Sequence, residues 1–455
     1  MIRIAIAALL GVALTGCATS VGMHDSSHTT PDPADPAAST APPPIASASA
    51  SRPAACRSAR PPIDTALATP AAQQLDRTLA DAVSQAGIVG LATAVIVDGR
   101  VVWTRTYGLA DRERSLPLTP QTAMNLASIA KTTIGVSMMR LVAEGRLDLD
   151  ADINTYLPFR VVNPHHPETR ITLRQLATHT SSITDRRDFY ASLYQPLDAP
   201  RPTLDALLRA YLVEGGADYR AENFLSVAPG ASRDYSNLAA TLAAYIVERV
   251  AGEPFDAHTR RVIFEPLGLC SATWTRRADA PHSQRYAQDP AGTRRIEPYA
   301  LPSYPEGGLQ MSIEDLARYF AMLLSGGALD GVRVIERKAL AEMQRFQWTA
   351  QHKPADYDLA EGNSGLFWRT KFNGQRVGHG GNDPGVEAEM LTDTEGRVGV
   401  VLISNTSLDG PARRHTLVVL DALSAYGRAI ASGQGPRIPD QQAPSPKAHA
   451  PSGDP

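Results

Sequence analysis

The sequence predicts an α/β protein of the α+β type, in which a largely antiparallel sheet is flanked by helices and joined to a helical, loop-rich subdomain. Segments with β-strand character cluster near both ends of the central region, at 91–107 and 366–404, whereas 148–300 is helical and rich in loops. Very short turns separate neighbouring β-rich segments, and strands joined so tightly pair as antiparallel hairpins.

The first predicted elements are a helix and a hairpin. Leu75, Leu79 and Ala82 recur at helical spacing and predict an amphipathic helix. The β-rich segments 91–97 and 101–107 flank Asp98-Gly99, a strong signal for a tight hairpin turn. A helix over 128–144 is expected to follow.

The last third of the domain returns to strands, in two further hairpins between two helices. The expected elements are a helix at 312–325, strands at 366–372 and 376–379 around Asn373-Gly374, strands at 386–392 and 397–404, and a closing helix at 412–428. The first and last helices are expected to cover the sheet.

The composition fits one large folded domain. The chain has 455 residues, 43% of them hydrophobic, and its formal net charge is -3. Nucleic-acid-binding surfaces show a strong basic excess, so this charge argues against nucleic acid as a partner. We expect the folded domain at 66–430, between a Pro/Ala/Ser-rich tether at 18–65 and a disordered tail at 431–455.

The N-terminal segment predicts export. A basic Arg3 precedes an apolar run that is too short to span a bilayer, and small residues follow, which together indicate a signal peptide over 1–17. The ending Leu-Thr-Gly-Cys resembles the lipobox of bacterial lipoproteins. That resemblance implies an acylated Cys17 and a periplasmic protein anchored to the outer membrane. An exported protein can oxidise its cysteines, but the sequence leaves open whether Cys56 and Cys270 pair.

Three short motifs carry candidate chemistry, and each occurs once. Ser128 and Lys131 form the Ser-x-x-Lys motif and share one face of a predicted helix, where an amine can activate a hydroxyl. Tyr235 and Asn237 form Tyr-x-Asn just before a helical segment, and a phenol acts as a base when cations stabilise its phenolate. Taken alone, these fit equally a polar pair at a helix start and a packing tyrosine.

The third motif is His379-Gly380-Gly381, at the end of a predicted strand. Glycines in a strand let another backbone approach closely, so the strand edge can bind a substrate. Taken alone, the motif also fits a glycine-rich hairpin corner.

Together, in this order, the motifs resemble those of the penicillin-recognising serine enzymes: class C β-lactamases, DD-peptidases and related esterases. The resemblance spans roughly 75–428 and implies a β-lactamase/transpeptidase-like fold and a cofactor-free, metal-free serine hydrolase. It implies acylation of Ser128, acid–base work shared by Lys131 and Tyr235, and acyl transfer from a small ester or amide or a cell-wall peptide. The implied substrate-binding residues are Asn237, His379, Gly380 and Gly381, and the implied oxyanion hole is formed by the backbone N–H groups of Ser128 and Asn382.

The third motif departs from the related Lys-Thr-Gly pattern. His379 replaces a lysine and Gly380 replaces a hydroxyl residue, and histidine is mostly neutral above its pKa of about 6.5. Weak binding of a substrate carboxylate is therefore expected, which favours an esterase or an aminopeptidase-like hydrolase. Ser182 also stands where relatives commonly carry glycine.

Two alternatives remain open from the sequence. The chain is alternatively a true β-lactamase or peptidoglycan DD-peptidase, or a binding or scaffold lipoprotein that has lost turnover. The motif Gly-x-Ser-x-Gly is absent from the sequence, so an α/β-hydrolase nucleophile elbow is not supported.

Overall fold

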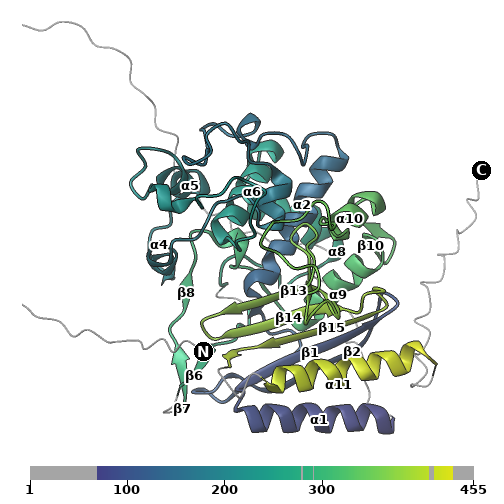
Figure 1. Cartoon of the computed structure of the whole chain (residues 1–455). Helices are drawn as coiled ribbons and strands as arrows, with labels where there is room; N and C mark the ends of the chain where they lie inside the picture. The colour runs from purple at the N-terminus through teal and green to yellow at the C-terminus, as the bar shows by residue number, and fades with distance from the viewer. Residues whose placement is uncertain (1–68, 278–279, 290–291, 409–413, 434–455) are drawn as a thin grey trace, which may run out of the picture. The chain divides into compact units, whose positions relative to one another are not determined.

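The computed structural model describes residues 69–277, 280–289, 292–408 and 414–433, drawn in colour in Figure 1. All of them fall within one compact unit that spans 52–455. The predicted signal peptide, the tether, Cys17, Cys56 and most of the predicted tail lie outside the described residues. Cys270 is disulfide-bonded.

A seven-stranded antiparallel sheet forms the centre of the described unit, as predicted (Figure 1). Its order is β12 (Arg369–Lys371), β13 (Arg376–Asp383), β14 (Val386–Thr392), β15 (Val398–Ser404), β1 (Gly90–Val97), β2 (Arg100–Asp111) and β3 (Leu116–Pro117). The three predicted hairpins are confirmed. Asp98 and Gly99, with φ of 48° and 75°, make the first turn.

Two terminal helices cover one face of this sheet. α1 (Pro70–Ala86) and α11 (Arg414–Ala431) contact each other and lie below the strands in Figure 1. Alternate residues of β1 enter two different cores: Val95 packs with the terminal helices, whereas Ala94 and Ile96 belong to the larger core on the other face. This alternation follows from the two-residue period of a strand.

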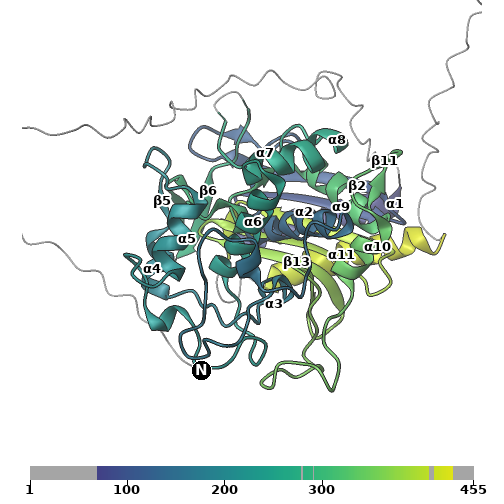
Figure 2. The same cartoon turned by 90° about the horizontal axis from the view of Figure 1, so that it is seen from above.

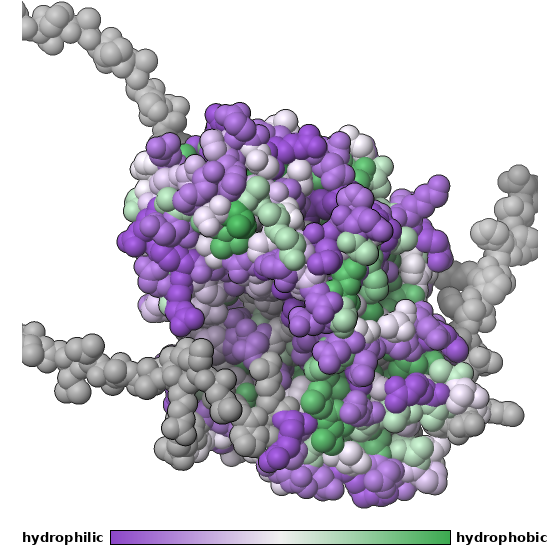
Figure 3. Space-filling view, in the orientation of Figure 1, coloured by the Kyte–Doolittle hydropathy of each residue, from purple (hydrophilic) through white to green (hydrophobic). Residues whose placement is uncertain are grey.

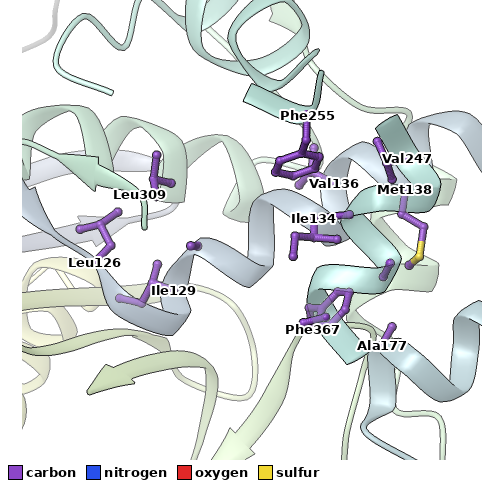
Figure 4. Packing of buried hydrophobic residues seen from close by; sticks show 14 of the residues in the cluster. Leu126, Ile129, Ile134, Val136, Met138, Ala177, Val247, Phe255, Leu309 and Phe367 are labelled. Atoms are coloured by element: carbon purple, nitrogen blue, oxygen red, sulfur yellow. The ribbon is translucent and has the colours of Figure 1, made fainter. Parts of the chain in front are cut away.

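The larger core surrounds α2 (Lys131–Ala143), of which ten residues are buried. α6 (Asn237–Ala251), α9 (Ile313–Leu324) and α10 (Arg337–Gln344) lie around it, seen from above in Figure 2. Figure 4 shows Ile134 and Val136 of α2 beside Phe255 and Phe367. A helix buried on nearly all sides holds its N-terminal turn firmly in place, and Ser128 lies at that turn.

The remaining elements are short. In chain order they are β4 (Met124–Asn125), η2 (Ala127–Ala130), η3 (Ile153–Thr155), α3 (Leu173–Thr178), α4 (Arg187–Ser192), β5 (Gln195–Pro196), α5 (Leu204–Leu212), η4 (Ala221–Asn223), α7 (Phe255–Thr259), η5 (Arg260–Phe264), α8 (Glu265–Leu267), β6 (Arg285–Asp289), β7 (Gly292–Ile296), β8 (Tyr299–Ala300), η6 (Tyr304–Glu306), β9 (Gln310–Met311), β10 (Ala328–Leu329), β11 (Val332–Arg333) and β16 (Thr406–Ser407).

The face shown in Figure 3 is mostly hydrophilic, with small separate hydrophobic patches. Among the described helices, none combines the length and the apolar character that a membrane crossing requires.

Candidate active site

The nucleophile candidate lies in a tight turn at the start of a buried helix. The segment predicted as one helix over 128–144 is a 3₁₀ turn, η2, followed by α2. Ala127 has a φ of 45°, a conformation that non-glycine residues seldom adopt, directly before Ser128. Asn125 supports this turn, because its Oδ1 accepts a 2.8 Å hydrogen bond from the Ala127 N–H and its Nδ2 donates to the carbonyl of Gly307.

Lys131 joins the predicted site residues to one another. Its Nζ donates to Oγ of Ser128 at 3.0 Å and to Oδ1 of Asn237 at 2.7 Å. It also donates to the backbone carbonyl of Glu306 at 2.8 Å and forms an ion pair with the side-chain carboxylate of Glu306 at 3.0 Å. The structure therefore brings the first and second motifs together around one buried amine.

The charge on this amine is set by two opposing effects. Burial lowers the pKa of Lys131, but the neighbouring Tyr235 and Glu306 raise it by more, so the net shift is upward. Lys131 is thus an ammonium group at neutral pH. In this form it donates to Ser128 and does not accept its proton.

Tyr235 lies directly before α6, with Lys131 Nζ 5.1 Å from its ring centroid. The ring packs against His179 at a centroid separation of 4.2 Å. Its hydroxyl is buried and has no hydrogen-bond partner among the described residues. The phenol therefore lies next to the ammonium of Lys131 and interacts with it.

Strand β13 places the third motif against the serine turn. A Cβ atom added to Gly381 would collide with the carbonyl of Leu126 and lie 3.1 Å from the backbone N of Ser128. Only glycine allows this approach. The backbone that comes close to Gly381 is the serine turn of the chain itself, whereas the sequence led us to expect a substrate there. The next residue, Asn382, has an exposed side chain, so its backbone is the part that the site can use.

His379 is buried and lies 6.5 Å from Tyr235, measured between ring centroids. Its Nδ1 is 2.7 Å from the carbonyl of Gly380, which makes Nδ1 the protonated nitrogen. Burial, with the nearby Arg369 and Lys131, lowers the pKa of His379 well below its ordinary value. The imidazole is neutral, in line with the expectation from the sequence. The space that a side chain at position 380 would fill is occupied by the ion pair of Lys371 and Glu389. Gly380 itself offers no hydroxyl to a substrate.

Three residues that position the site were missed by the sequence analysis. Glu306 precedes two glycines, with no motif to mark its pairing with Lys131. Asp185 accepts hydrogen bonds from the N–H groups of Asn237 and Leu238 and so caps α6 beside Tyr235. His179 supports the Tyr235 ring. Such roles depend on contacts between distant segments, so sequence spacing alone does not assign them.

Ser182 has a backbone conformation that is typical of glycine. Its φ is 65°, in the left-handed region that favours glycine. Its hydroxyl accepts a 2.9 Å hydrogen bond from Nδ2 of the fully buried Asn163. The hydrogen bond offsets part of the backbone cost of a non-glycine residue at this position.

The fold and this serine–lysine–tyrosine arrangement define a class of protein with the β-lactamase/transpeptidase architecture. No cluster of His, Cys, Asp or Glu side chains able to hold a metal ion occurs within the described ranges. A model of the family described as Beta-lactamase matches residues 75–424. The chain belongs to the Beta-lactamase family.

Curated relatives differ in what they are described to be. Esterase EstB of Burkholderia gladioli is 32% identical over 44% of this chain and 50% of its own length. The putative penicillin-binding protein PbpX of Bacillus subtilis is 27% identical over 51% of this chain and 55% of its own. The D-alanyl-D-alanine-carboxypeptidase/endopeptidase AmpH of Escherichia coli is 27% identical over 58% and 64%. The chain thus matches less than two thirds of the length of each of these relatives.

Solved structures share the fold. The octameric penicillin-binding protein homologue from Pyrococcus abyssi superposes with a TM-score of 0.63 and 22% identity, covering 80% of this chain and 78% of that one. The D-amino acid amidase from Ochrobactrum anthropi SV3 gives 0.62 and 21%, covering 78% and 99%. At these identities the likeness concerns the fold alone.

Proposed function

We propose that the chain is a serine hydrolase that forms an acyl-enzyme at Ser128 and acts preferentially on esters. The observation that carries the proposal is the position of Lys131, whose ammonium donates to Ser128 and Asn237 while Glu306 balances its charge. Burying an ion pair beside one hydroxyl disfavours folding, because both charges lose their hydration. The arrangement is well suited to stabilising negative charge beside that hydroxyl.

The reaction follows from these positions. Tyr235 serves as the general base and removes the proton from Ser128, the ammonium of Lys131 stabilises the charge that moves between the two oxygens, and the serine Oγ bonds to the substrate carbonyl carbon. The carbonyl oxygen becomes an oxyanion held by the backbone N–H groups of Ser128 and Asn382. The bond to the leaving group breaks as Tyr235 returns the proton to it. Water then attacks the acyl-enzyme by the same steps and frees Ser128.

The preference for esters rests on the third motif. A neutral His379 and a glycine at 380 supply neither an ammonium nor a hydroxyl for a substrate carboxylate. The similarity to Esterase EstB supports the same preference.

A β-lactamase or DD-peptidase is the second candidate. Arg369 supports it, since its guanidinium lies 5.9 Å from the Tyr235 ring centroid and could attract a carboxylate. The similarity to PbpX and AmpH also favours it. A scaffold protein without turnover is a third possibility, which the complete set of Ser128, Lys131, Tyr235 and Asn237 argues against.

The test is labelling followed by turnover. A fluorophosphonate probe should label the wild-type protein and fail on Ser128→Ala, with intact-mass analysis placing the adduct on Ser128. Steady-state rates on p-nitrophenyl butyrate, nitrocefin and a D-Ala-D-Ala peptide then rank the candidates. Nitrocefin turnover far above ester turnover would reverse the stated preference, and an unlabelled, folded wild-type protein would favour the scaffold.

We further propose that Cys17 anchors the enzyme to the outer membrane, facing the periplasm. The lipobox-like sequence supports this, because an acylated cysteine gains about 0.8 kcal/mol of membrane affinity for each methylene group that its acyl chains bury in a bilayer. Cys17→Ser should move the protein from the membrane pellet to the soluble fraction after cell lysis. Retention in the pellet would contradict the anchor.

A further inference from the structure

A second carboxylate lies near the serine turn, on the same strand as the third motif. His379, Gly381 and Asp383 alternate along β13 and therefore share one face. Gly381 touches the serine turn, and Oδ2 of Asp383 lies 3.6 Å from the position that a Cβ on Gly307 would occupy. The same position is 3.9 Å from the backbone of Ala127, the residue before Ser128. Asp383 thus lies near the serine turn, and along β13 it is on the other side of Gly381 from His379.

The carboxylate of Asp383 is only half satisfied. The residue is 8% exposed, and its Oδ1 accepts a 2.8 Å hydrogen bond from the hydroxyl of Tyr194. Its Oδ2 is buried and finds no hydrogen-bond partner in the part of the chain that the structure describes. A buried acceptor without a donor is costly, so this oxygen is suited to a donor that arrives with a ligand.

Among the described residues Asp383 has no ion-pair partner, although the charges of Lys131 and Arg285 act on it from nearby. The ammonium of Lys131 is already paired with Glu306, whose other oxygen accepts from Tyr190 at 2.8 Å. The guanidinium of Arg285 stacks 3.7 Å above the Tyr299 ring, and among the described residues no ion pair joins it to Asp383. Burial and the neighbouring Glu306 raise the pKa of Asp383 to about 7. A ligand that brings a positive charge would relieve both effects.

The groups around Asp383 suit a small cation. Tyr194 packs edge-on against Tyr190 and Tyr299, at centroid separations of 5.8 Å and 4.9 Å. Aromatic rings attract cations, and a hydroxyl next to a carboxylate offers a second acceptor. A primary ammonium is compact and carries three donors, whereas a divalent metal needs more oxygen ligands than one orphan carboxylate oxygen supplies.

We propose that Asp383, held by Tyr194 and backed by Glu306, is a specificity-determining subsite for a primary ammonium group of the substrate. This rests on the proposed function. A carbonyl bound by the N–H groups of Ser128 and Asn382 lies one residue from Asp383 along the strand. The subsite therefore selects esters or amides that carry a free amino group close to the scissile carbonyl, such as amino-acid esters and amides.

Matched substrates test the subsite. Alanine ethyl ester and N-acetylalanine ethyl ester, each as D and L forms, differ only in the ammonium and the configuration. Wild-type kcat/KM should favour the free amine at least about tenfold, the range of a charge-assisted hydrogen bond. Asp383→Asn should bring this ratio close to one, while Asp421→Asn, an exposed carboxylate on α11, should preserve it. A wild-type preference for the acetylated ester, or a ratio that Asp383→Asn leaves unchanged, overturns the subsite.

Further measurements separate this inference from the proposed function. Should Asp383→Asn fail to fold, Tyr194→Phe should lower the same ratio, and ethylammonium should competitively inhibit wild-type hydrolysis of p-nitrophenyl butyrate where ethanol does not. Hydrolysis of that neutral ester without any amine preference or inhibition overturns the subsite alone. If the wild type lacks all hydrolysis, alanine amide binding to Ser128→Ala by calorimetry decides: binding lost with Asp383→Asn supports the subsite, and absence of binding overturns it.

Discussion

Nζ of Lys131 lies 3.0 Å from Oε2 of Glu306, and the two side chains are 0% and 2% exposed. Removing one partner of such a buried pair destabilises the protein by more than the intact pair stabilises it, because the remaining charge stays buried without a partner. Glu306→Ala should therefore destabilise the protein by about 3–5 kcal/mol in urea unfolding. Asp421→Ala, which breaks an ion pair whose carboxylate is 74% exposed, should cost less than about 1 kcal/mol. Equal losses would contradict this assignment.

The milder Glu306→Gln separates charge from packing. The substitution removes one cause that raises the pKa of Lys131 and leaves burial, which lowers it. The ammonium should then deprotonate at lower pH, so the alkaline limb of the kcat/KM profile should move to lower pH. The profile of the Asp421→Asn variant should stay in place. An unmoved alkaline limb in Glu306→Gln would show that Lys131 does not set it.

Removing the hydroxyl of Tyr235 should reduce catalysis without reducing stability. Apart from its interaction with Lys131, the buried hydroxyl has no hydrogen-bond partner among the described residues, so its removal should cost the fold little. As the general base, it should contribute about 10²–10⁴-fold to kcat. Tyr235→Phe should therefore lose activity in that range with a Tm that is unchanged or higher, because the substitution removes a buried hydroxyl without a further hydrogen-bond partner. Tyr426→Phe, on the opposite side of the sheet, should keep both. A drop in rate of less than tenfold for Tyr235→Phe would remove this tyrosine from the mechanism.

Two neighbouring residues of β13 should respond in opposite ways. Gly381→Ala forces a methyl group against Leu126 and Ala127, so it must push the strand away from Ser128 and slow acylation strongly. Asn382→Ala shortens an exposed side chain and keeps the backbone N–H, so acylation should change little. Stopped-flow acylation with p-nitrophenyl butyrate measures both. A collapse in Asn382→Ala with the fold intact would argue against the backbone oxyanion hole.

Asp383 should make stability depend on pH. Its pKa is raised to about 7 in the folded protein, by burial and by Glu306, against the opposing influence of Tyr194, Lys131 and Arg285. Between a pH of about 3.9, the pKa of an aspartate in the unfolded chain, and pH 7, the folded state binds more protons than the unfolded state. The contribution of Asp383 to the free energy of unfolding therefore falls as the pH rises. Asp383→Asn should therefore be more stable than wild type at pH 8, with the advantage shrinking toward pH 4. Thermal unfolding across this range measures it, and an advantage that grows on acidification would contradict the sign.

Local patterns were sufficient to predict most of the sheet. Asp98-Gly99 and Asn373-Gly374 specify tight turns through backbone conformations that only a few residue types adopt, so the hairpins could be read directly. The helix predicted at 312–325 is likewise observed, as α9. The pairing of β1 with β15 had no such signal, because it joins segments at opposite ends of the domain.

The same distinction applies to the site. Ser128, Lys131, Tyr235 and Asn237 belong to short motifs, and the sequence could nominate them. Glu306 and Asp383 are single carboxylates that gain their importance from burial, which depends on the packing of α4, η6 and β13 around them. Sequence spacing cannot show that an acidic side chain is enclosed.

The pairing of Leu91 with Ser404 also bears on how the chain is made. Strand β1 is synthesised early, yet its partner β15 follows only after most of the domain. Contacts between segments so distant along the chain form slowly, since the entropy of closing a long loop is lost before the contacts stabilise the structure. During synthesis the β1 edge of the first hairpin therefore stays unpaired until β15 has been made. A chain that ends before β15 would keep that edge unpaired, and an unpaired strand edge is prone to aggregation.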